Sequence, residues 1–372
     1  MTQLSFRAAR IFDGTAFCDG ALRVEGGRVA GFGPADGKTV DLGEGMIVPG
    51  MIDLQVNGAG GIAVDGATDA DALAGICATM ARLGATGCLP TLITDTTDAT
   101  ARVLTAGADA ARRGVAGFLG LHLEGPHLDP RRAGAHDPAL IRPMTEGDLS
   151  RLTAARPRLP ALMVTVAPEA VTPAQIARLT EAGIVVSLGH SDCDAATARR
   201  AMQAGARCAT HLFNAMSQMT SRAPGLAGAV LDGDGFAGLI ADGLHVDPVT
   251  LRVALAAKGE GIFLVSDCMA LAGTDRTDMR LGGRLIRRGG GRLTLADGTL
   301  AGADLTLPQA VATLAAIGIA ETRALAMATS IPARVIGRHD IGTLRAGARA
   351  DFLHLGPDGG LRGVWRGGVA LA

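Results

Sequence analysis

The segment LHLEGPHL, residues 121–128, shows how this chain is built. An apolar run, 117–123, is typical of a buried strand, and it ends in the carboxylate Glu124. A Gly-Pro pair follows at once and turns the chain. A carboxylate at the end of a buried strand loses its hydration unless a positive charge compensates it. The segment therefore predicts a strand that ends in a functional acid.

Seven further apolar runs resemble this one, and Ala-, Arg- and Asp-rich helical stretches such as 69–84 and 172–183 separate most of them. The eight expected strands lie within residues 46–58, 86–94, 117–125, 161–169, 183–191, 207–215, 236–246 and 261–269. Strand and helix in eightfold alternation indicate an α/β chain whose parallel strands close into a (β/α)8 TIM-type barrel.

Both ends of the chain have a different texture, with short strands and tight glycine turns. We expect residues 1–48 and 344–372 to pair into one small, discontinuous β-sandwich domain beside a barrel formed by residues 49–343. Residues 275–302 are typical of a hairpin-rich insertion after the last barrel strand.

Bulk properties exclude several classes of protein. The 372 residues carry a formal net charge of −1 without a basic stripe, so neither nucleic acid nor a membrane surface is an expected partner. The N-terminus lacks the apolar core of a signal peptide, and the longest uncharged apolar run, 305–320, is too short to span a bilayer. Six scattered cysteines without a C-x-x-C pair predict neither a disulfide framework nor a thiolate zinc site. A cytoplasmic protein is expected.

Ionisable side chains stand at or just beyond the ends of five expected strands, where barrels of this type gather their chemistry. They are Glu124, His190, His211, His245 and Asp267. Two histidines and one carboxylate that leave a coordination position open are a catalytic zinc set. The pattern therefore predicts that Glu124, His190 and His211 bind a metal ion and that Asp267 is a working group.

Other histidines fit this pattern less well. His122 and His127 flank Glu124, but we expect structural or supporting roles for them, because His122 would face the barrel interior. His339 and His354 lie outside the strand ends.

Longer motifs connect these residues. They are PGMIDLQVNGAGG (49–61), LPTLIT (89–94), GLHLEGPHLDPRRAGAHDP (120–138), VSLGHSD (186–192), ATHLFNAMSQMTSRAPGLAGAVLD (209–232), IADGLHVDP (240–248), LVSDCMALAG (264–273) and TLAGADLTL (299–307). In this order the chain resembles, nearly end to end, the N-acetylglucosamine-6-phosphate deacetylases of the amidohydrolase superfamily.

The resemblance implies metal-dependent hydrolysis of the acetamide of N-acetylglucosamine 6-phosphate, and it implies a role for each site residue. It implies that Glu124, His190 and His211 hold one divalent ion, zinc in the first place, with Fe2+, Co2+ or Mn2+ as alternatives. Asp267 would act as general base and then as general acid. Many amidohydrolases bind a second metal through His-x-His on the first strand, and here Gln55 and Asn57 stand at those positions.

The resemblance also implies how a phosphorylated amino sugar would be held. The implied substrate contacts are Ala135, His136, Asn214, Ala215, Arg222, Asp242, Gly243, Leu244, His245, Leu300, Ala301 and Gly302. Either His136 or His245 would polarise the acetamide carbonyl, with His136 preferred. Arg222 is the expected phosphate ligand, and it acts within its own subunit or reaches a neighbouring site in an expected homodimer.

Three alternatives stay open. The substrate is either the glucosamine compound or its galactosamine epimer. Other amidohydrolases commonly need His-x-His or a carbamylated lysine, and none of the expected barrel strands contains a lysine. A non-catalytic, barrel-derived binding protein would be expected to lose a ligand or the acid, whereas all four residues are present.

Overall fold

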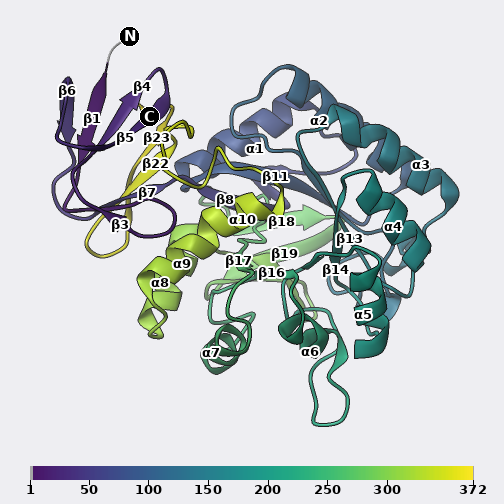
Figure 1. Cartoon of the computed structure of the whole chain (residues 1–372). Coiled ribbons are helices and arrows are strands. Elements are labelled where there is room, and N and C mark those ends of the chain that lie inside the picture. Colours follow the sequence, from purple (N-terminus) through teal and green to yellow (C-terminus); the bar gives the residue numbers. More distant parts are fainter. Residues whose placement is uncertain (1–2, 372) are drawn as a thin grey trace.

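A single eight-stranded parallel sheet forms the centre of the molecule, as Figure 1 shows. The computed structural model describes residues 3–371. Each strand neighbours the next one along the chain, and nearly every residue in these strands is buried, as expected for a sheet covered on both faces. The strands are β8 (Met51–Val56), β11 (Ala85–Ile93), β12 (Leu121–Glu124), β13 (Leu162–Val166), β14 (Val185–Leu188), β15 (Cys208–Ala209), β16 (Phe236–Leu239) and β17 (Ile262–Leu264).

The first and last strands close the sheet into a barrel. Val56 and Cys268 form a parallel bridge between them, and the amide of Asp267 donates to Gln55 O at 3.1 Å. The buried carboxylate of Asp53 accepts the amide of Ser266 at 3.2 Å across the same seam. The expected (β/α)8 barrel is therefore confirmed, and its seam lies beside Asp267.

Helices cover the outer side of the strands (Figure 1). They are α1 (Ala70–Arg82), α2 (Thr97–Arg112), α3 (Glu146–Ala155), α4 (Pro173–Glu181), α5 (Ala195–Gln203), α6 (Gly225–Asp232), α7 (Pro248–Ala257), α8 (Leu307–Ala316), α9 (Glu321–Ala328) and α10 (Ser330–Val335). Asp69 and Thr96 cap the first two, each accepting a backbone N–H of the first turn. Short 3-10 turns occur at Pro130–Arg132, Pro138–Leu140 and Arg156–Arg158.

One expected strand proves to be two. Residues 46–58 were expected as a single strand, but they form β7 (Met46–Pro49) and β8, which belong to different sheets. Gly50 separates them, and a Cβ at this position would meet Thr86 Oγ1 at 2.0 Å. Any larger residue at this point would therefore force the side chain of Thr86 to move.

The two ends of the chain build the small domain, as expected, and Figure 1 shows them side by side. One sheet has the order β5-β4-β1-β6 and the other β24-β23-β22-β7-β2-β3. Their strands are β1 (Leu4–Arg7), β2 (Arg10–Phe12), β3 (Phe17–Cys18), β4 (Ala21–Glu25), β5 (Arg28–Gly33), β6 (Lys38–Asp41), β22 (Phe352–Leu355), β23 (Leu361–Arg366) and β24 (Val369–Ala370). Phe6, Phe352 and Trp365 pack as a group, with Phe352 stacked on Trp365 at 5.0 Å between centroids.

The insertion after β17 is a four-stranded antiparallel sheet with the order β18-β19-β20-β21. Its strands are β18 (Asp278–Leu281), β19 (Arg284–Gly289), β20 (Arg292–Thr294) and β21 (Leu300–Ala303). Ile286 and Leu293 pack on Met269, just beyond the end of β17. A two-stranded ribbon, β9 (Gly58–Ala59) with β10 (Ile62–Ala63), follows β8. Within residues 3–371, no helix is both long and apolar enough to cross a membrane.

Candidate active site

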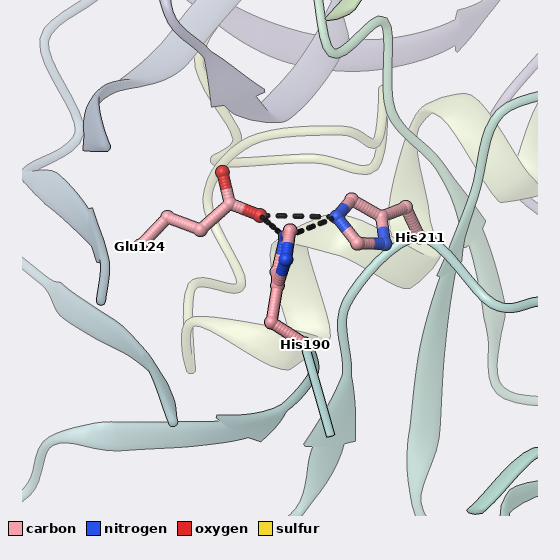
Figure 2. Close-up of side chains that lie close together, drawn as sticks. All are labelled: Glu124, His190 and His211. Atoms are coloured by element: carbon pink, nitrogen blue, oxygen red, sulfur yellow. Dashed lines mark hydrogen bonds and ion pairs between the residues drawn. The ribbon is translucent and has the colours of Figure 1, made fainter. Parts of the chain in front are cut away.

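Glu124, His190 and His211 meet at the carboxyl ends of β12, β14 and β15, and Figure 2 shows their polar atoms pointing at one another. Glu124 Oε1 lies 3.2 Å from His190 Nε2 and 3.1 Å from His211 Nε2. The two imidazole nitrogens are 3.1 Å apart. The three side chains predicted to bind a metal therefore form one buried cluster.

The geometry of this cluster fits a divalent ion. Ligand atoms about 2.0–2.1 Å from a tetrahedral ion lie roughly 3.3 Å from one another, close to the spacing of these three atoms. Burial alone would raise the pKa of Glu124, but His190 and His211 hold the pKa of this carboxyl well below its usual range. A carboxylate and two imidazoles are also the donor types that zinc prefers.

A neighbouring carbonyl orients one of the two histidines of the cluster. His190 Nδ1 donates to the carbonyl of Arg132 at 2.8 Å, which leaves Nε2 free to act as a ligand. The Nδ1 atom of His211 is buried without a hydrogen-bond partner among the described residues. One ligand is thus fixed in a single tautomer.

The backbone is strained at this site. The non-glycine residues with positive φ among the described residues are His190 (47°), His211 (29°), Phe213 (75°), Ala215 (48°) and Asp267 (50°). Such conformations cost about 1–3 kcal/mol each and persist only where the surroundings enforce them. The strain is therefore concentrated in the two histidines of the cluster, in Asp267 and in the loop after His211.

Asp267 lies beside the cluster, just beyond the end of β17, and its Oδ1 accepts a 2.7 Å hydrogen bond from Asn57 Nδ2. Burial and the negative charge of Glu124 raise the pKa of Asp267 to about 6, while His211 and Asn57 oppose that rise. A carboxyl with a pKa near neutrality is suited to general acid–base work.

Gln55 donates to Glu124 as Asn57 donates to Asp267. Its Nε2 lies 3.1 Å from Glu124 Oε1. The sequence identified Gln55 and Asn57 only as the residues at the His-x-His positions of many amidohydrolases. Their roles as donors to Glu124 and Asp267 were missed. Strand alternation was the available signal, because it directs both amides into the barrel mouth.

His136 is held in a defined tautomer. The backbone N–H of Thr94 donates to His136 Nδ1 at 3.2 Å, so the proton of the neutral ring lies on Nε2. Burial and the neighbouring His190 lower the pKa of His136 to about 3, which keeps the ring neutral. Its Nε2 lies 3.8 Å from Glu124 Oε2. The ring therefore presents an N–H donor beside the cluster.

His245 has the opposite arrangement. Its Nδ1 donates to Asp242 Oδ2 at 2.6 Å, which leaves Nε2 as the free ring nitrogen. The carboxylate of Asp242 also accepts the backbone N–H of His245 at 2.8 Å. Asp242 thus orients His245, which lines the cavity.

A cavity of about 380 Å³ opens over the cluster. Of the expected substrate contacts it is lined by Ala135, His136, Asn214, Ala215, His245, Leu300, Ala301 and Gly302. Arg222, Asp242, Gly243 and Leu244 are not among its lining residues, and Arg222 is exposed in the loop before α6.

Two arginines of the cavity wall were missed, although they stand within the 120–138 motif. Arg131 pairs with Asp129 at 2.6 Å, and Arg132 pairs with Asp192 at 2.6 Å. Both guanidinium groups therefore already have carboxylate partners.

The remaining histidines lie outside the cluster. His122 points into the barrel and contacts Leu54 O and Thr165 Oγ1, and His127 contacts Arg142 O. His339 is exposed, and His354 contacts Glu44 O in the small domain.

Comparison with known proteins shows the family to which this architecture belongs. Residues 46–371 match the amidohydrolase family. The chain is 38% identical to the N-acetylgalactosamine-6-phosphate deacetylase of Shewanella sp. (strain ANA-3), over 91% of this chain and 86% of that protein.

Solved structures agree. The N-acetylglucosamine-6-phosphate deacetylase of Pasteurella multocida superposes with a TM-score of 0.95 at 31% identity, covering 100% of both chains. A mutant of the Mycobacterium smegmatis N-acetyl-D-glucosamine-6-phosphate deacetylase, in complex with N-acetyl-D-glucosamine-6-phosphate, gives 0.91 at 33% identity, covering 99% of this chain and 98% of that one. The chain therefore belongs to the amidohydrolase family, in the branch that includes these amino-sugar-6-phosphate deacetylases.

Proposed function

We propose that the protein hydrolyses the acetamide of N-acetyl-D-glucosamine 6-phosphate to D-glucosamine 6-phosphate and acetate. The observation that carries this proposal is the convergence of Glu124, His190 and His211 with Asp267 in one cavity. The names of the related deacetylases support the choice of substrate class.

Glu124, His190 and His211 would hold one divalent ion, with zinc as the first choice and Fe2+, Co2+ or Mn2+ as alternatives. When bound, such an ion polarises a carbonyl group and lowers the pKa of water toward neutrality. A second ion would need imidazole ligands at positions 55 and 57, and the neutral amides of Gln55 and Asn57 are poor replacements for them, which supports a single ion.

The acid–base work falls to Asp267. As the water oxygen adds to the acetamide carbon, Asp267 takes the water proton. It then delivers that proton to the amine nitrogen as the C–N bond breaks, which leaves acetate and the free amine. Asn57 holds Oδ1 of this carboxylate throughout.

His136 rather than His245 is suited to the developing oxyanion. Its Nε2 carries the proton and lies beside the cluster, so it donates to the carbonyl oxygen as negative charge grows. The free nitrogen of His245 suits a sugar hydroxyl. Ala135 and residues 300–302 would contact the rest of the sugar.

The phosphate requires hydrogen-bond donors, and the cavity supplies only some of them. Arg131 and Arg132 in the cavity wall already pair with carboxylates. Arg222 is exposed and does not line the cavity of its own subunit. We therefore assign the phosphate to Asn214, to the backbone of Ala215 and to Arg222 of a neighbouring subunit in a homodimer. We further infer a cytoplasmic location, in keeping with six free cysteines.

The galactosamine epimer is the second candidate substrate. The Shewanella relative at 38% identity bears the name of an N-acetylgalactosamine-6-phosphate deacetylase. Because the two sugars differ only in the configuration at one carbon, discrimination would rest on contacts to a single hydroxyl.

An acetate-release assay on both phosphorylated sugars tests the proposal. The enzyme is stripped with a chelator and then reloaded with zinc. We expect acetate from N-acetylglucosamine 6-phosphate only after reloading, with a higher kcat/KM than for the epimer. A higher kcat/KM for the epimer would make the galactosamine compound the preferred substrate. No acetate from either sugar would overturn the proposal.

A further inference from the structure

Four buried polar side chains form a chain of hydrogen bonds inside the barrel, close to the metal cluster. His122 Nε2 lies 2.7 Å from Thr165 Oγ1, which lies 2.6 Å from Thr210 Oγ1. Thr210 Oγ1 in turn lies 2.7 Å from Ser187 Oγ. All four residues are at most 2% exposed. We call this set the hydroxyl belt.

The belt has one consistent direction. The carbonyl of Leu54 can only accept, so Nδ1 of His122 donates to it at 3.0 Å. In the neutral ring Nε2 then accepts from Thr165, which accepts from Thr210, which accepts from Ser187. Every bond in the belt has one donor and one acceptor, so the four strands that carry it are tied in a single arrangement.

Three of these strands lead to the three residues of the cluster. His122 is on β12 with Glu124, Ser187 is on β14 before His190, and Thr210 directly precedes His211. Thr165, on the intervening β13, is in register with both Glu124 and Ser187. The belt thus connects the supports of all three ligands.

The belt packs tightly against Gly189, the residue before His190. A Cβ on Gly189 would lie 2.9 Å from Thr165 Cγ2 and 3.0 Å from Thr210 Cβ. The two histidine ligands next to these residues have positive φ, so their backbone must be held in place by its surroundings. Barrel interiors are usually filled by branched apolar side chains, so hydroxyl groups at this level call for another explanation.

We propose that Thr165, Thr210, Ser187 and His122 are positioning residues that hold Glu124, His190 and His211 in metal-binding geometry. This inference rests on the proposed function, because it takes the cluster to be a metal site. It differs from that proposal in assigning a role to residues that do not contact the ion.

Zinc affinity of the chelator-stripped protein tests the belt. Thr165→Val and Thr210→Val keep the side-chain shape and remove one hydroxyl each. We expect zinc to bind roughly 10–100-fold more weakly to each of them, the usual effect of losing a group that supports a metal ligand. Thr165→Ser, which retains the hydroxyl, should restore most of the affinity.

Thr91→Val is the matched control. Thr91 is a buried barrel threonine on β11, where it accepts Val56 N at 2.9 Å and donates to Leu89 O at 3.0 Å, but β11 carries none of the three ligands. We expect this variant to lower the melting temperature while its zinc affinity stays within about twofold of the wild type, since its hydroxyl bonds only the backbone of β8 and β11, which carry none of the three ligands. The visible spectrum of cobalt-loaded protein should change in Thr165→Val and not in Thr91→Val.

The outcomes separate the two proposals. If the wild type binds zinc and Thr165→Val binds it equally tightly, or if Thr91→Val weakens it as much, the belt has no positioning role. Should the valine variants fail to fold, Ser187→Ala at the end of the belt must still weaken zinc binding, and unchanged affinity there would overturn the inference. A wild type that binds no divalent ion would overturn the proposed function as well.

Discussion

Asn57 Nδ2 lies 2.7 Å from Asp267 Oδ1, so the first strand of the barrel holds the acid at the end of the last one. The bond crosses the seam where the barrel closes, beside the backbone contact from Asp267 N to Gln55 O. The position that could have carried a second metal ligand is thereby used to orient the carboxylate of Asp267.

Replacing Asn57 with alanine should shift the pH dependence of turnover. The hydrogen bond from Asn57 stabilises the charged form of Asp267 and lowers its pKa. Without it the pKa rises, and since the base must be deprotonated, the acidic limb of kcat/KM should move to higher pH. Measured pH–rate profiles check this, with Gln55→Ala as a control that removes a neighbouring amide but keeps the hydrogen bond from Asn57 to Asp267. An unchanged acidic limb in Asn57→Ala would contradict it.

Asp267→Asn should keep the metal and lose turnover. An amide cannot accept a proton, and general acid–base catalysis typically contributes about 10²–10⁴-fold. We expect kcat to fall by that amount while zinc content stays at the wild-type level by elemental analysis. A loss smaller than about tenfold would remove Asp267 from the role of general base.

Arg222→Ala should raise KM strongly for the phosphorylated sugar and hardly change weak activity on unphosphorylated N-acetylglucosamine. A charge-assisted contact contributes roughly 1.5–3 kcal/mol, on the order of ten- to a hundredfold in affinity. Arg222→Lys should recover only part, because a point charge replaces a planar fork. Equal KM changes on both sugars would mean that Arg222 does not bind phosphate.

Mixing Arg222→Ala with Asp267→Asn protein tests whether the arginine acts across subunits. In a mixed dimer one site would combine an intact Asp267 with an intact Arg222 from the partner, so activity at low substrate should exceed the sum of the separate proteins. Activity that is merely additive after subunit exchange would place Arg222 in its own subunit's site.

Asp148 should make the protein sensitive to acid. This buried carboxylate accepts from Thr145 Oγ1 at 2.6 Å and from Arg142 at 2.5 and 2.8 Å. Burial opposes ionisation, but the bonds from Arg142 and Thr145 hold the pKa of Asp148 well below its usual range. The folded state therefore binds fewer protons than the unfolded state, in which the pKa of Asp148 is about 3.9.

The stabilisation from Asp148 is thus complete above that value and is lost as the pH falls toward the lower pKa of the folded state. Urea unfolding of wild type and Asp148→Asn should show a large difference in unfolding free energy at neutral pH. That difference should shrink below about pH 4. A difference that is independent of pH would contradict the assignment.

The sequence was sufficient to predict that Glu124, His190 and His211 cluster, but not what surrounds them. Their convergence was predictable because parallel strands bring their carboxyl ends together whatever the details of packing. The bond between Asn57 and Asp267 depends on how the barrel closes. The tautomer of His136 depends on a backbone N–H, that of Thr94, which no side-chain pattern reveals. The proposed role of Arg222 across subunits depends on assembly, which one chain does not specify.

The metal content of purified Glu124→Ala, measured beside the wild type, tests the central claim most directly. Glu124 supplies the only carboxylate of the cluster formed by the described residues, so its loss should abolish tight binding. We predict one divalent ion per wild-type chain and almost none in the variant, with acetate release lost in parallel. Full metal occupancy in Glu124→Ala, or two ions per wild-type chain, would contradict this account.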